Sequence, residues 1–182
     1  MKMAFLFPGQ GVQMLGMARE FYDSVPASRR IFEIASEALG RDIAAITFGK
    51  DEAALGLTHN TQPCLLAAEL ACWQALENAG QCPDAVSGFS LGEWSALVAA
   101  DVMEPAVAFV LVQKRADAMQ HAVAVGEGGM LAILGCEDSV VAALCNEVGG
   151  GVWPSNYNCP GQVTIAGEKM AIDRVQVLCE GQ

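Results

Sequence analysis

Residues 86–98, VSGFSLGEWSALV, contain the pattern that decides the fold. Gly88, Ser90 and Gly92 fit G-x-S-x-G, in which a strand turns sharply into a helix and lifts a serine hydroxyl clear of the sheet. The stretch before this pattern is short and extended, and the stretch after it has helical periodicity. This context favours a nucleophile elbow with Ser90 as the reactive group, and the alternative is a structural turn.

A second sharp turn lies at the start of the chain. Residues 3–7 form a continuous apolar run, typical of a buried strand, and the stretch FPGQG at residues 7–11 ends it. No Gly-Lys-Ser/Thr follows, so this turn is not a phosphate loop. Taken alone it indicates the glycine-capped start of a helix over residues 10–22.

The rest of the chain changes character at a glycine-rich joint, residues 126–129. Before this joint, helical periodicity and stop signals predict helices at 26–39, 62–79, 92–100 and 106–122. After it, the pattern predicts strand, helix, strand, strand and helix at 130–134, 138–147, 152–157, 162–166 and 170–179. We therefore expect an α/β fold with two domains, residues 1–125 and 126–182.

Composition narrows the classes of partner. The formal net charge is −11, and the ten Lys and Arg residues form no run that would neutralise a nucleic acid backbone. An acidic ligand must therefore be held by one or two individually placed cations. The apolar run before Pro8 is too short for a signal peptide or a membrane span, so we expect a cytoplasmic protein.

The cysteines do not form a metal-binding or disulfide pattern. They are odd in number and contain no C-x-x-C pair, so we expect reduced, buried thiols and no metal ion. The seven positions are Cys64, Cys72, Cys82, Cys136, Cys145, Cys159 and Cys179.

Arg115 is a candidate ligand-binding cation. In the predicted helix at 106–122 it lies within an apolar stripe, and a guanidinium there must meet an anion. One interpretation is an ion pair with an internal carboxylate; the other is a fork that binds a ligand carboxylate. The stripe consists of Val107, Val110, Leu111, Ala118, Met119 and Ala122.

The sequence offers no obvious base for Ser90. A serine nucleophile needs a base within hydrogen-bonding reach, and the chain has two histidines. His59 lies in a polar stretch before a helix, and His121 follows Arg115 on another face of its helix. For both we expect a solvated surface position.

Several motifs together resemble the malonyl-CoA:acyl carrier protein transacylase family of fatty acid and polyketide synthesis. They occur in family order along essentially the whole chain. The matching stretches are FPGQG at 7–11, NTQP at 60–63, GFSLGEWSAL at 88–97, LVQKRADAMQ at 111–120, GGMLAILG at 128–135 and SNYNCPGQVTIAGE at 155–168.

The resemblance assigns roles to individual positions. It implies that Ser90 becomes acylated, that the amides of Gln10 and Leu91 form the oxyanion hole, and that Arg115 binds the malonyl carboxylate. It also implies an acyl site lined in part by other side chains, and Phe89 departs from the family there because His is usual at that position. These candidate lining residues are Gln62, Phe89, Met119 and Asn158.

The resemblance also implies a fold, and it implies that part of this fold is missing from the chain. The fold is an α/β-hydrolase-like large domain with an inserted ferredoxin-like small domain, here without its last strand. The family's catalytic histidine belongs to a stretch beyond Gln182. We therefore expect a truncated form, inactive or weakly active alone, that associates with itself or with a complementary C-terminal polypeptide.

The function that the resemblance implies is malonyl transfer from malonyl-CoA to the phosphopantetheine thiol of acyl carrier protein, with no bound cofactor. Two alternatives stay open. A serine thioesterase or other hydrolase uses the same elbow with water as acceptor. A non-catalytic remnant or carrier-binding module fits the missing base.

Overall fold

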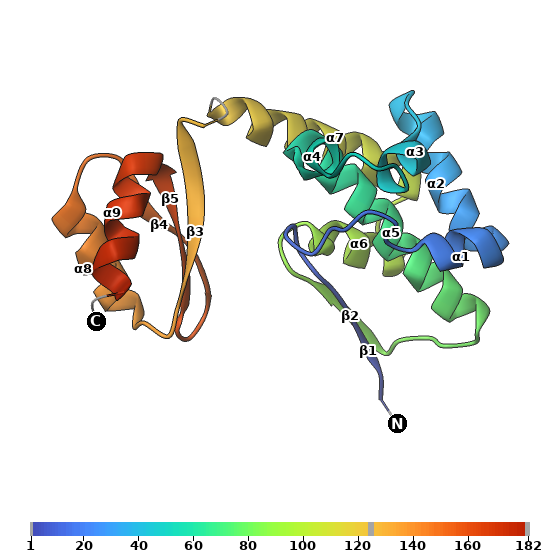
Figure 1. Cartoon of the computed structure of the whole chain (residues 1–182). Coiled ribbons are helices and arrows are strands. Elements are labelled where there is room, and N and C mark those ends of the chain that lie inside the picture. Colours follow the sequence, from blue (N-terminus) through green and yellow to red (C-terminus); the bar gives the residue numbers. More distant parts are fainter. Residues whose placement is uncertain (1, 124–125, 181–182) are drawn as a thin grey trace. The chain divides into compact units, whose positions relative to one another are not determined.

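The computed structural model describes residues 2–123 and 126–180, and it is a mixed α/β structure (Figure 1). Contacts between residues group the chain into two compact units, Met1–His121 and Ala122–Gln182. The mixed α/β class predicted from the sequence is confirmed. The assignment of residues 1–125 and 126–182 as domains stays a prediction.

The sheet of the first unit contains two parallel strands from distant parts of the sequence. Strand β1 (Ala4–Phe7) pairs with β2 (Ala85–Gly88), with Ala4 opposite Ala85 and Phe7 opposite Gly88. One face is partly covered, while the other exposes Ala4, Leu6, Ala85 and Ser87. Both strands lead directly into the two turns that the sequence singled out.

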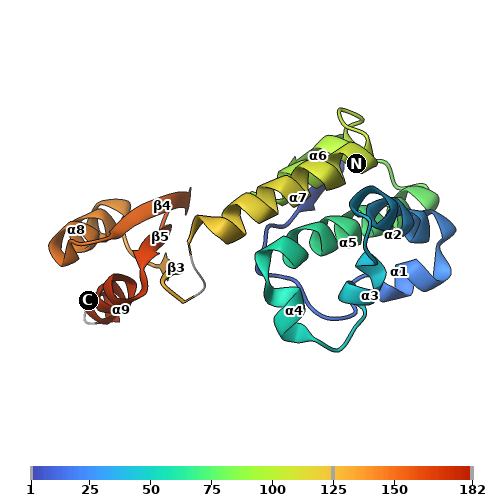
Figure 2. The same cartoon turned by 90° about the horizontal axis from the view of Figure 1, so that it is seen from above.

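Helices make up most of the first unit. They are α1 (Arg19–Ser24), α2 (Pro26–Leu39), α3 (Ile43–Thr47), α4 (Glu52–Gly56), α5 (Thr58–Asn78), α6 (Gly92–Ala99) and α7 (Pro105–Ala122). The central helix is α5, whose first half is buried almost throughout and packs against α2 and α6 (Figure 2).

The helix expected at 10–22 is wrong over most of its length. Helix α1 begins only at Arg19, and Gly11 and Gly16 before it have φ values of 121° and 81°. Ala18, at its N-cap, also has a left-handed φ of 60°. These positive φ values are incompatible with a continuous right-handed helix through the segment.

Helix α5 begins four residues earlier than the predicted start at residue 62. Pro63 lacks an amide, so the carbonyl of His59 has no main-chain partner within the helix. Two side chains replace that partner: Arg41 Nη2 donates to His59 O at 2.8 Å and Gln113 Nε2 at 3.2 Å. The first turn of α5 is therefore held by residues distant in the sequence, which local pattern does not show.

The second unit has the strand and helix order that the sequence predicts. Its antiparallel sheet has the order β3-β5-β4, and α8 and α9 pack on one face of it (Figure 2). The opposite face exposes large apolar side chains, including Met130 and Trp153, which both lie opposite Ala166 in the register of the sheet. The elements are β3 (Gly128–Leu134), α8 (Asp138–Val148), β4 (Val152–Cys159), β5 (Gln162–Glu168) and α9 (Lys169–Glu180).

No disulfide joins the seven cysteines, all of which lie in the described part of the chain, and they are not uniformly buried. Cys64 and Cys145 are buried, whereas Cys82 and Cys159 are exposed, so the expectation of buried thiols is wrong for the latter two. Within residues 2–123 and 126–180, no group of His, Cys, Asp and Glu side chains is placed to hold a metal ion. Among the described helices, none combines the length and apolar character needed to cross a bilayer.

Candidate active site

Ser90 lies at a strained turn between β2 and α6. Its φ of 53° falls in the left-handed region, which a non-glycine residue rarely adopts. A Cβ at Gly88 would lie 2.0 Å from the carbonyl carbon of Gly92, and a Cβ at Gly92 would lie 2.2 Å from Phe7 O. Both flanking positions therefore require glycine, which is the physical content of the G-x-S-x-G pattern.

The turn that follows β1 packs directly against this elbow. Phe89 N donates to Phe7 O at 2.9 Å, which continues the pairing of the two strands beyond their ends. A Cβ at Gly9 would lie 2.8 Å from the Phe89 ring and 2.9 Å from Phe89 O. The two turns singled out in the sequence are thus brought together, and Gly9 allows their close approach.

The main-chain amides of Gln10 and Leu91 have no hydrogen-bond acceptor within the described residues. Leu91 is fully buried at the N-cap of α6, where the first amides of a helix lack intrahelical acceptors. Such free amides suit an anionic oxygen. Their role as an oxyanion hole stays a prediction.

Arg115 lies on α7 with its guanidinium directed at Ser90. Its Nη2 donates to Ser90 Oγ at 3.2 Å, and its Nη1 donates to Gln62 Oε1 at 2.7 Å. It makes no ion pair in the described part of the chain, so the internal ion pair that the sequence left open is not present there. Burial lowers the pKa of Arg115 and the Glu93 carboxylate opposes this shift, while a guanidinium stays charged near neutral pH.

The helix face that the sequence assigned around Arg115 is wrong. The buried residues of α7 are Ala108, Phe109, Val112 and Ala116, whereas Val107, Val110, Leu111 and Met119 of the predicted stripe are exposed. Arg115 is half-buried at the border between these two faces. The error has a simple cause, because α7 is apolar around much of its circumference and periodicity alone does not select one face.

Gln62 connects these groups. Its side chain is fully buried on α5, and its Nε2 donates to Gln10 Oε1 and to Met119 Sδ, each at 3.3 Å. Together with its bond from Arg115, this makes a continuous polar chain from Gln10 through Gln62 and Arg115 to Ser90. Gln10 Nε2 extends the chain to Thr58 Oγ1 at 3.4 Å.

The remaining candidates fall into two groups. Phe89 and Met119 are 54% and 46% exposed, so both present apolar surface to incoming molecules. Asn158 belongs to β4 of the second unit, where its Nδ2 donates to Thr164 Oγ1 at 3.1 Å. Its predicted part in the acyl site stays a prediction.

Neither histidine side chain contacts Ser90 in the part of the chain that the structure describes. His121 Nδ1 lies 2.6 Å from Asp117 O, and His59 accepts hydrogen bonds through its main-chain carbonyl. His121 is exposed, as expected from the sequence, whereas His59 is only partly exposed.

A group of side chains centred on Arg41, a residue outside the motifs quoted from the sequence, holds α5 against α7. Arg41 donates to Asn60 Oδ1 at 2.5 Å and to Gln113 Oε1 at 2.6 Å, and Gln113 Nε2 donates to Asp117 Oδ1 at 2.8 Å. These contacts fix the two helices that carry Gln62 and Arg115. They join residues far apart in the sequence, so no local signal reveals them.

The geometry combines an exposed hydroxyl, a cation within hydrogen-bonding distance and free main-chain amides. Residues 4–181 match the family model for the acyl transferase domain. The chain belongs to the acyl transferase domain family. The elbow and the polar chain from Gln10 to Ser90 are formed by residues of the sequence stretches on which the resemblance to the family rests.

Curated relatives are about two-fifths identical to this chain over the part that matches it. Malonyl CoA-acyl carrier protein transacylase of Bacillus subtilis is 41% identical, and the match covers 98% of this chain and 57% of the relative. The enzyme of that name from Escherichia coli K12 is 43% identical over 97% of this chain and 58% of its own length.

Solved structures of acyl transferase domains agree. An acyl-carrier-protein S-malonyltransferase of Burkholderia pseudomallei has a TM-score of 0.88 at 44% identity, covering 100% of this chain and 60% of that protein. A type II PKS acyl carrier protein in complex with its malonyl-transacylase gives 0.90 at 41% identity, again covering 100% and 60%. The chain thus spans less than two-thirds of the length of these relatives.

Proposed function

We propose that this chain carries the nucleophile-bearing part of a malonyl-CoA:acyl carrier protein acyltransferase. The observation that carries the proposal is the contact of Arg115 Nη2 with Ser90 Oγ at 3.2 Å. A guanidinium next to a nucleophile selects acyl groups that end in a carboxylate. The names of the relatives point to the same acyl group.

The proposed reaction has two acyl-transfer steps. Ser90 Oγ attacks the thioester carbonyl of malonyl-CoA, a base takes the hydroxyl proton, and the carbon–sulfur bond breaks to release CoA as its thiol. The phosphopantetheine thiol of acyl carrier protein then attacks the seryl ester, and Ser90 regains its proton as the carbon–oxygen bond breaks. The amides of Gln10 and Leu91 stabilise the oxyanion in both steps.

Side chains around Ser90 have distinct proposed roles. Arg115 binds the free carboxylate of the malonyl group, and Gln62 holds the guanidinium by accepting its Nη1 bond at 2.7 Å. Phe89 and Met119 line the acyl site with apolar surface. Asn158 is a further polar contributor to the acyl site.

We propose that the base for Ser90 comes from the part of the relatives that this chain does not match. Support comes from the two histidines, neither of which contacts Ser90 within the described residues. Loss of one member of a catalytic group typically costs several powers of ten in rate. We therefore expect this chain alone to be weakly active or inactive.

The finer fold assignment belongs to the proposal. The sheet order β3-β5-β4, with α8 and α9 on one face, supports a ferredoxin-like second unit that lacks one strand beside β3. The strand–elbow–helix order β2, Ser90, α6 supports a hydrolase-like first unit.

The proposed acyl acceptor is acyl carrier protein. Support comes from the similar solved structure in which a type II PKS acyl carrier protein is in complex with its malonyl-transacylase. If water were the acceptor instead, the chain would act as a hydrolase. We expect a chain of this family to transfer malonate to the carrier thiol faster than it releases free malonate.

The proposal is tested by intact-mass spectrometry after incubation with malonyl-CoA. The chain is measured alone and with a separate polypeptide comprising the unmatched part of the Bacillus subtilis relative. With that polypeptide present, we expect one malonyl unit on the wild-type chain, none on Ser90→Ala, and a normal adduct on Ser87→Ala, which alters an exposed serine of β2. A supplemented, folded chain that gains no malonyl unit would contradict the proposal.

A further inference from the structure

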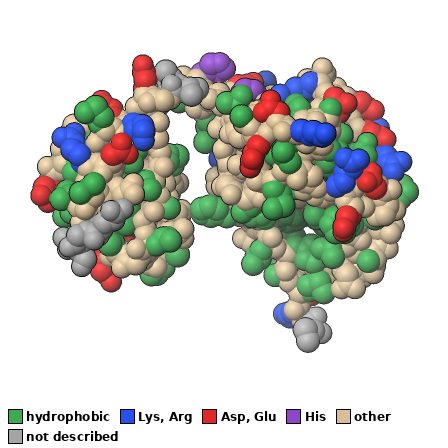
Figure 3. Space-filling model, in the orientation of Figure 1, with side chains coloured by type: hydrophobic (Ala, Val, Ile, Leu, Met, Phe, Trp, Pro, Cys, Tyr) green, Lys and Arg blue, Asp and Glu red, His purple; other side chains and the backbone are tan. Residues whose placement is uncertain are grey.

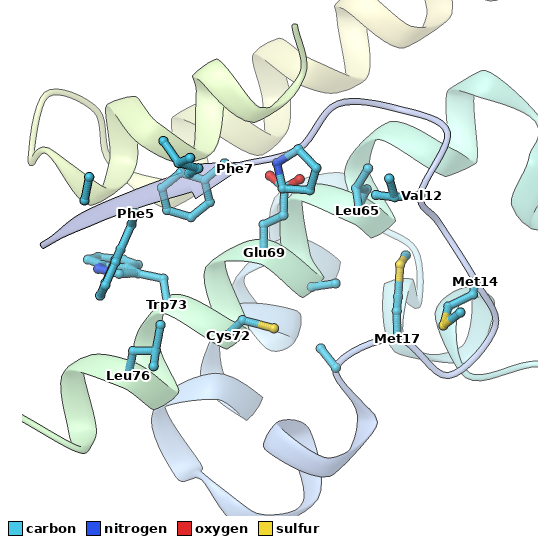
Figure 4. A pocket seen from close by; sticks show the side chains of 15 residues that line it. Phe5, Phe7, Val12, Met14, Met17, Leu65, Glu69, Cys72, Trp73 and Leu76 are labelled. Carbon is cyan, nitrogen blue, oxygen red and sulfur yellow. The ribbon is translucent and has the colours of Figure 1, made fainter. Parts of the chain in front are cut away.

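Glu69 differs from the other ionisable residues of the first unit in its burial. Figure 3 shows the charged side chains of this unit at the surface, mostly over the helices. Glu69 of α5 is only 6% exposed, and among the described residues it is the one Asp, Glu, Lys or Arg that is buried. Its side chain extends from α5 toward the strand that carries Phe7 (Figure 4). The residues that contact the acyl group in the proposed reaction do not include it.

The hydrogen-bond partner of Glu69 is Ser95 of α6. Ser95 is fully buried, and its Oγ donates to Glu69 Oε2. In the described part of the chain, this is the only side-chain hydrogen bond that joins α5 to α6. Leu91 and Val98 otherwise place α6 in the same apolar core as the buried residues of α5. Because apolar contacts have no direction, the bond to Ser95 is the contact that fixes how α6 is rotated on α5.

Ser95 follows the elbow by one helical turn. Leu91, whose amide is one of the two proposed oxyanion donors, lies four residues earlier, so both side chains lie on one face of α6. Where a serine inside a helix has no other acceptor, its hydroxyl bonds to the carbonyl four residues earlier, and such bonds often bend the helix. For Ser95 that carbonyl belongs to Leu91. The bond to Glu69 therefore keeps the Ser95 hydroxyl away from the first turn of α6.

The elbow needs support from outside because its backbone is strained. Ser90 has a φ of 53°, and a non-glycine residue keeps such a conformation only where the surrounding structure holds it. On the strand side, Phe89 N donates to Phe7 O at 2.9 Å. On the helix side, the corresponding polar support is the bond between Ser95 and Glu69.

This bond contributes little to stability. Glu69 Oε1 has no hydrogen-bond partner among the described residues, so the buried carboxyl makes one hydrogen bond and loses those that it made with water. Replacing a buried polar pair by apolar side chains of similar size often leaves a protein equally stable or more stable. The effect of Glu69 is then on the geometry of α6 more than on the free energy of unfolding.

We propose that Glu69 is a positioning residue for Ser90: its bond with Ser95 fixes α6 on α5, and α6 orients the Ser90 hydroxyl and the Leu91 amide. This inference rests on the proposed function, because it concerns acylation of Ser90. Glu69 acts through α6 and does not touch the acyl group, whereas Arg115 binds the malonyl carboxylate. Loss of Glu69 therefore slows transfer of different acyl groups equally, while loss of Arg115 changes the preference between them.

The test measures acylation of Ser90 by malonyl-CoA and by acetyl-CoA with intact-mass kinetics, in the presence of the unmatched part of the Bacillus subtilis relative. For Glu69→Leu we expect the maximal rate to fall about tenfold with both substrates at unchanged KM, because the attacking oxygen and one oxyanion donor are displaced. The malonyl-to-acetyl ratio stays at the wild-type value, and the melting temperature is equal or higher. Glu69→Gln, which still accepts from Ser95, keeps the wild-type rate.

Two further variants separate positioning from folding. Glu69→Leu/Ser95→Ala removes both polar groups, and we expect it to be as slow as Glu69→Leu and no slower, because the two residues act through one bond. Glu77→Leu, which alters an exposed carboxyl of α5, keeps the wild-type rate. Circular dichroism gives the folded fraction of each variant.

The outcomes separate this inference from the proposed function. A wild-type chain that gains no acyl group contradicts the proposed function and, with it, the positioning role. If the wild-type chain is acylated, the positioning role alone is overturned by a Glu69→Leu variant that reacts as fast as wild type, or by a Glu69→Gln variant that is as slow as Glu69→Leu. A loss of rate that equals the loss of folded protein overturns it as well.

Discussion

Helix α5 carries two buried polar side chains that differ in how completely they are hydrogen-bonded. At its start, Gln62 uses both ends of its amide, with bonds to Arg115, Gln10 and Met119. Two turns later, Glu69 Oε1 has no hydrogen-bond partner among the described residues, and neither has Trp73 Nε1. The difference shows that the Ser90 end is organised within the described chain, whereas the β1 side presents polar atoms that still lack partners.

The Ser90 end of α5 is tested most strongly by the variant Arg115→Ala. This variant removes the cation beside Ser90, and we expect malonyl labelling of Ser90 to fall a few hundredfold relative to acetyl labelling, because the charged hydrogen bond to the malonyl carboxylate is lost. Intact-mass kinetics with malonyl-CoA and acetyl-CoA measure the ratio. Lys114→Ala, which removes an exposed neighbouring cation, serves as the control. An unchanged ratio in Arg115→Ala would show that the guanidinium does not select the acyl group.

The β1 side of α5, where Glu69 lies, is tested through the pH dependence of the free energy of unfolding. Burial raises the pKa of Glu69 from 4.5 to about 7, although the bond from Ser95 opposes this shift. Between these values the folded chain holds a proton that the unfolded chain releases. The free energy of unfolding therefore falls as pH rises from about 4.5 to 7, by roughly 3 kcal/mol, and the contribution is constant outside this window.

Glu69→Gln removes this proton, so we expect the variant to gain stability over wild type as pH rises through the window. Urea unfolding at several pH values measures the difference. Glu77→Gln, an exposed carboxyl on the same helix, should track wild type throughout. Parallel curves for wild type and Glu69→Gln would mean that the pKa of Glu69 is the same in the folded and the unfolded chain.

Much of the fold was predictable because local signals were strong. Gly40 ends α2 in the left-handed conformation, as a C-terminal glycine predicts, and the order of elements after residue 126 follows from alternating strand and helix patterns. The prediction of a helix at residues 10–22 failed because positive φ values at Gly11 and Gly16 override an apparently helical pattern. The predicted start of α5 was too late because side chains of Arg41 and Gln113 replace the hydrogen bond that Pro63 removes.

The sequence predicted which residues form the site better than it predicted how they are arranged. Ser90 and Arg115 were chosen correctly as neighbours only through the family resemblance, since periodicity placed Arg115 on the wrong face of α7. Glu69 was not singled out, although a lone carboxylate in the apolar run CLLAAELAC at 64–72 was a visible signal. Its pairing with Ser95 depends on how α5 and α6 pack, which the sequence does not encode locally.

The smallest effect is expected for Gln62→Leu, which sharpens the comparison within α5. Leu keeps approximate size but removes the acceptor for Arg115 Nη1 and the donor to Gln10, so the guanidinium keeps its charge and loses its orientation. We expect malonyl labelling to fall about tenfold, mainly through weaker malonyl-CoA binding, because a charged hydrogen bond of this kind contributes about 1.5 kcal/mol or more. Combining it with Arg115→Ala should add little, since the two residues act through one contact. If the two losses multiply instead, Gln62 acts on the acyl group directly and the polar chain from Gln10 to Ser90 is not a single unit.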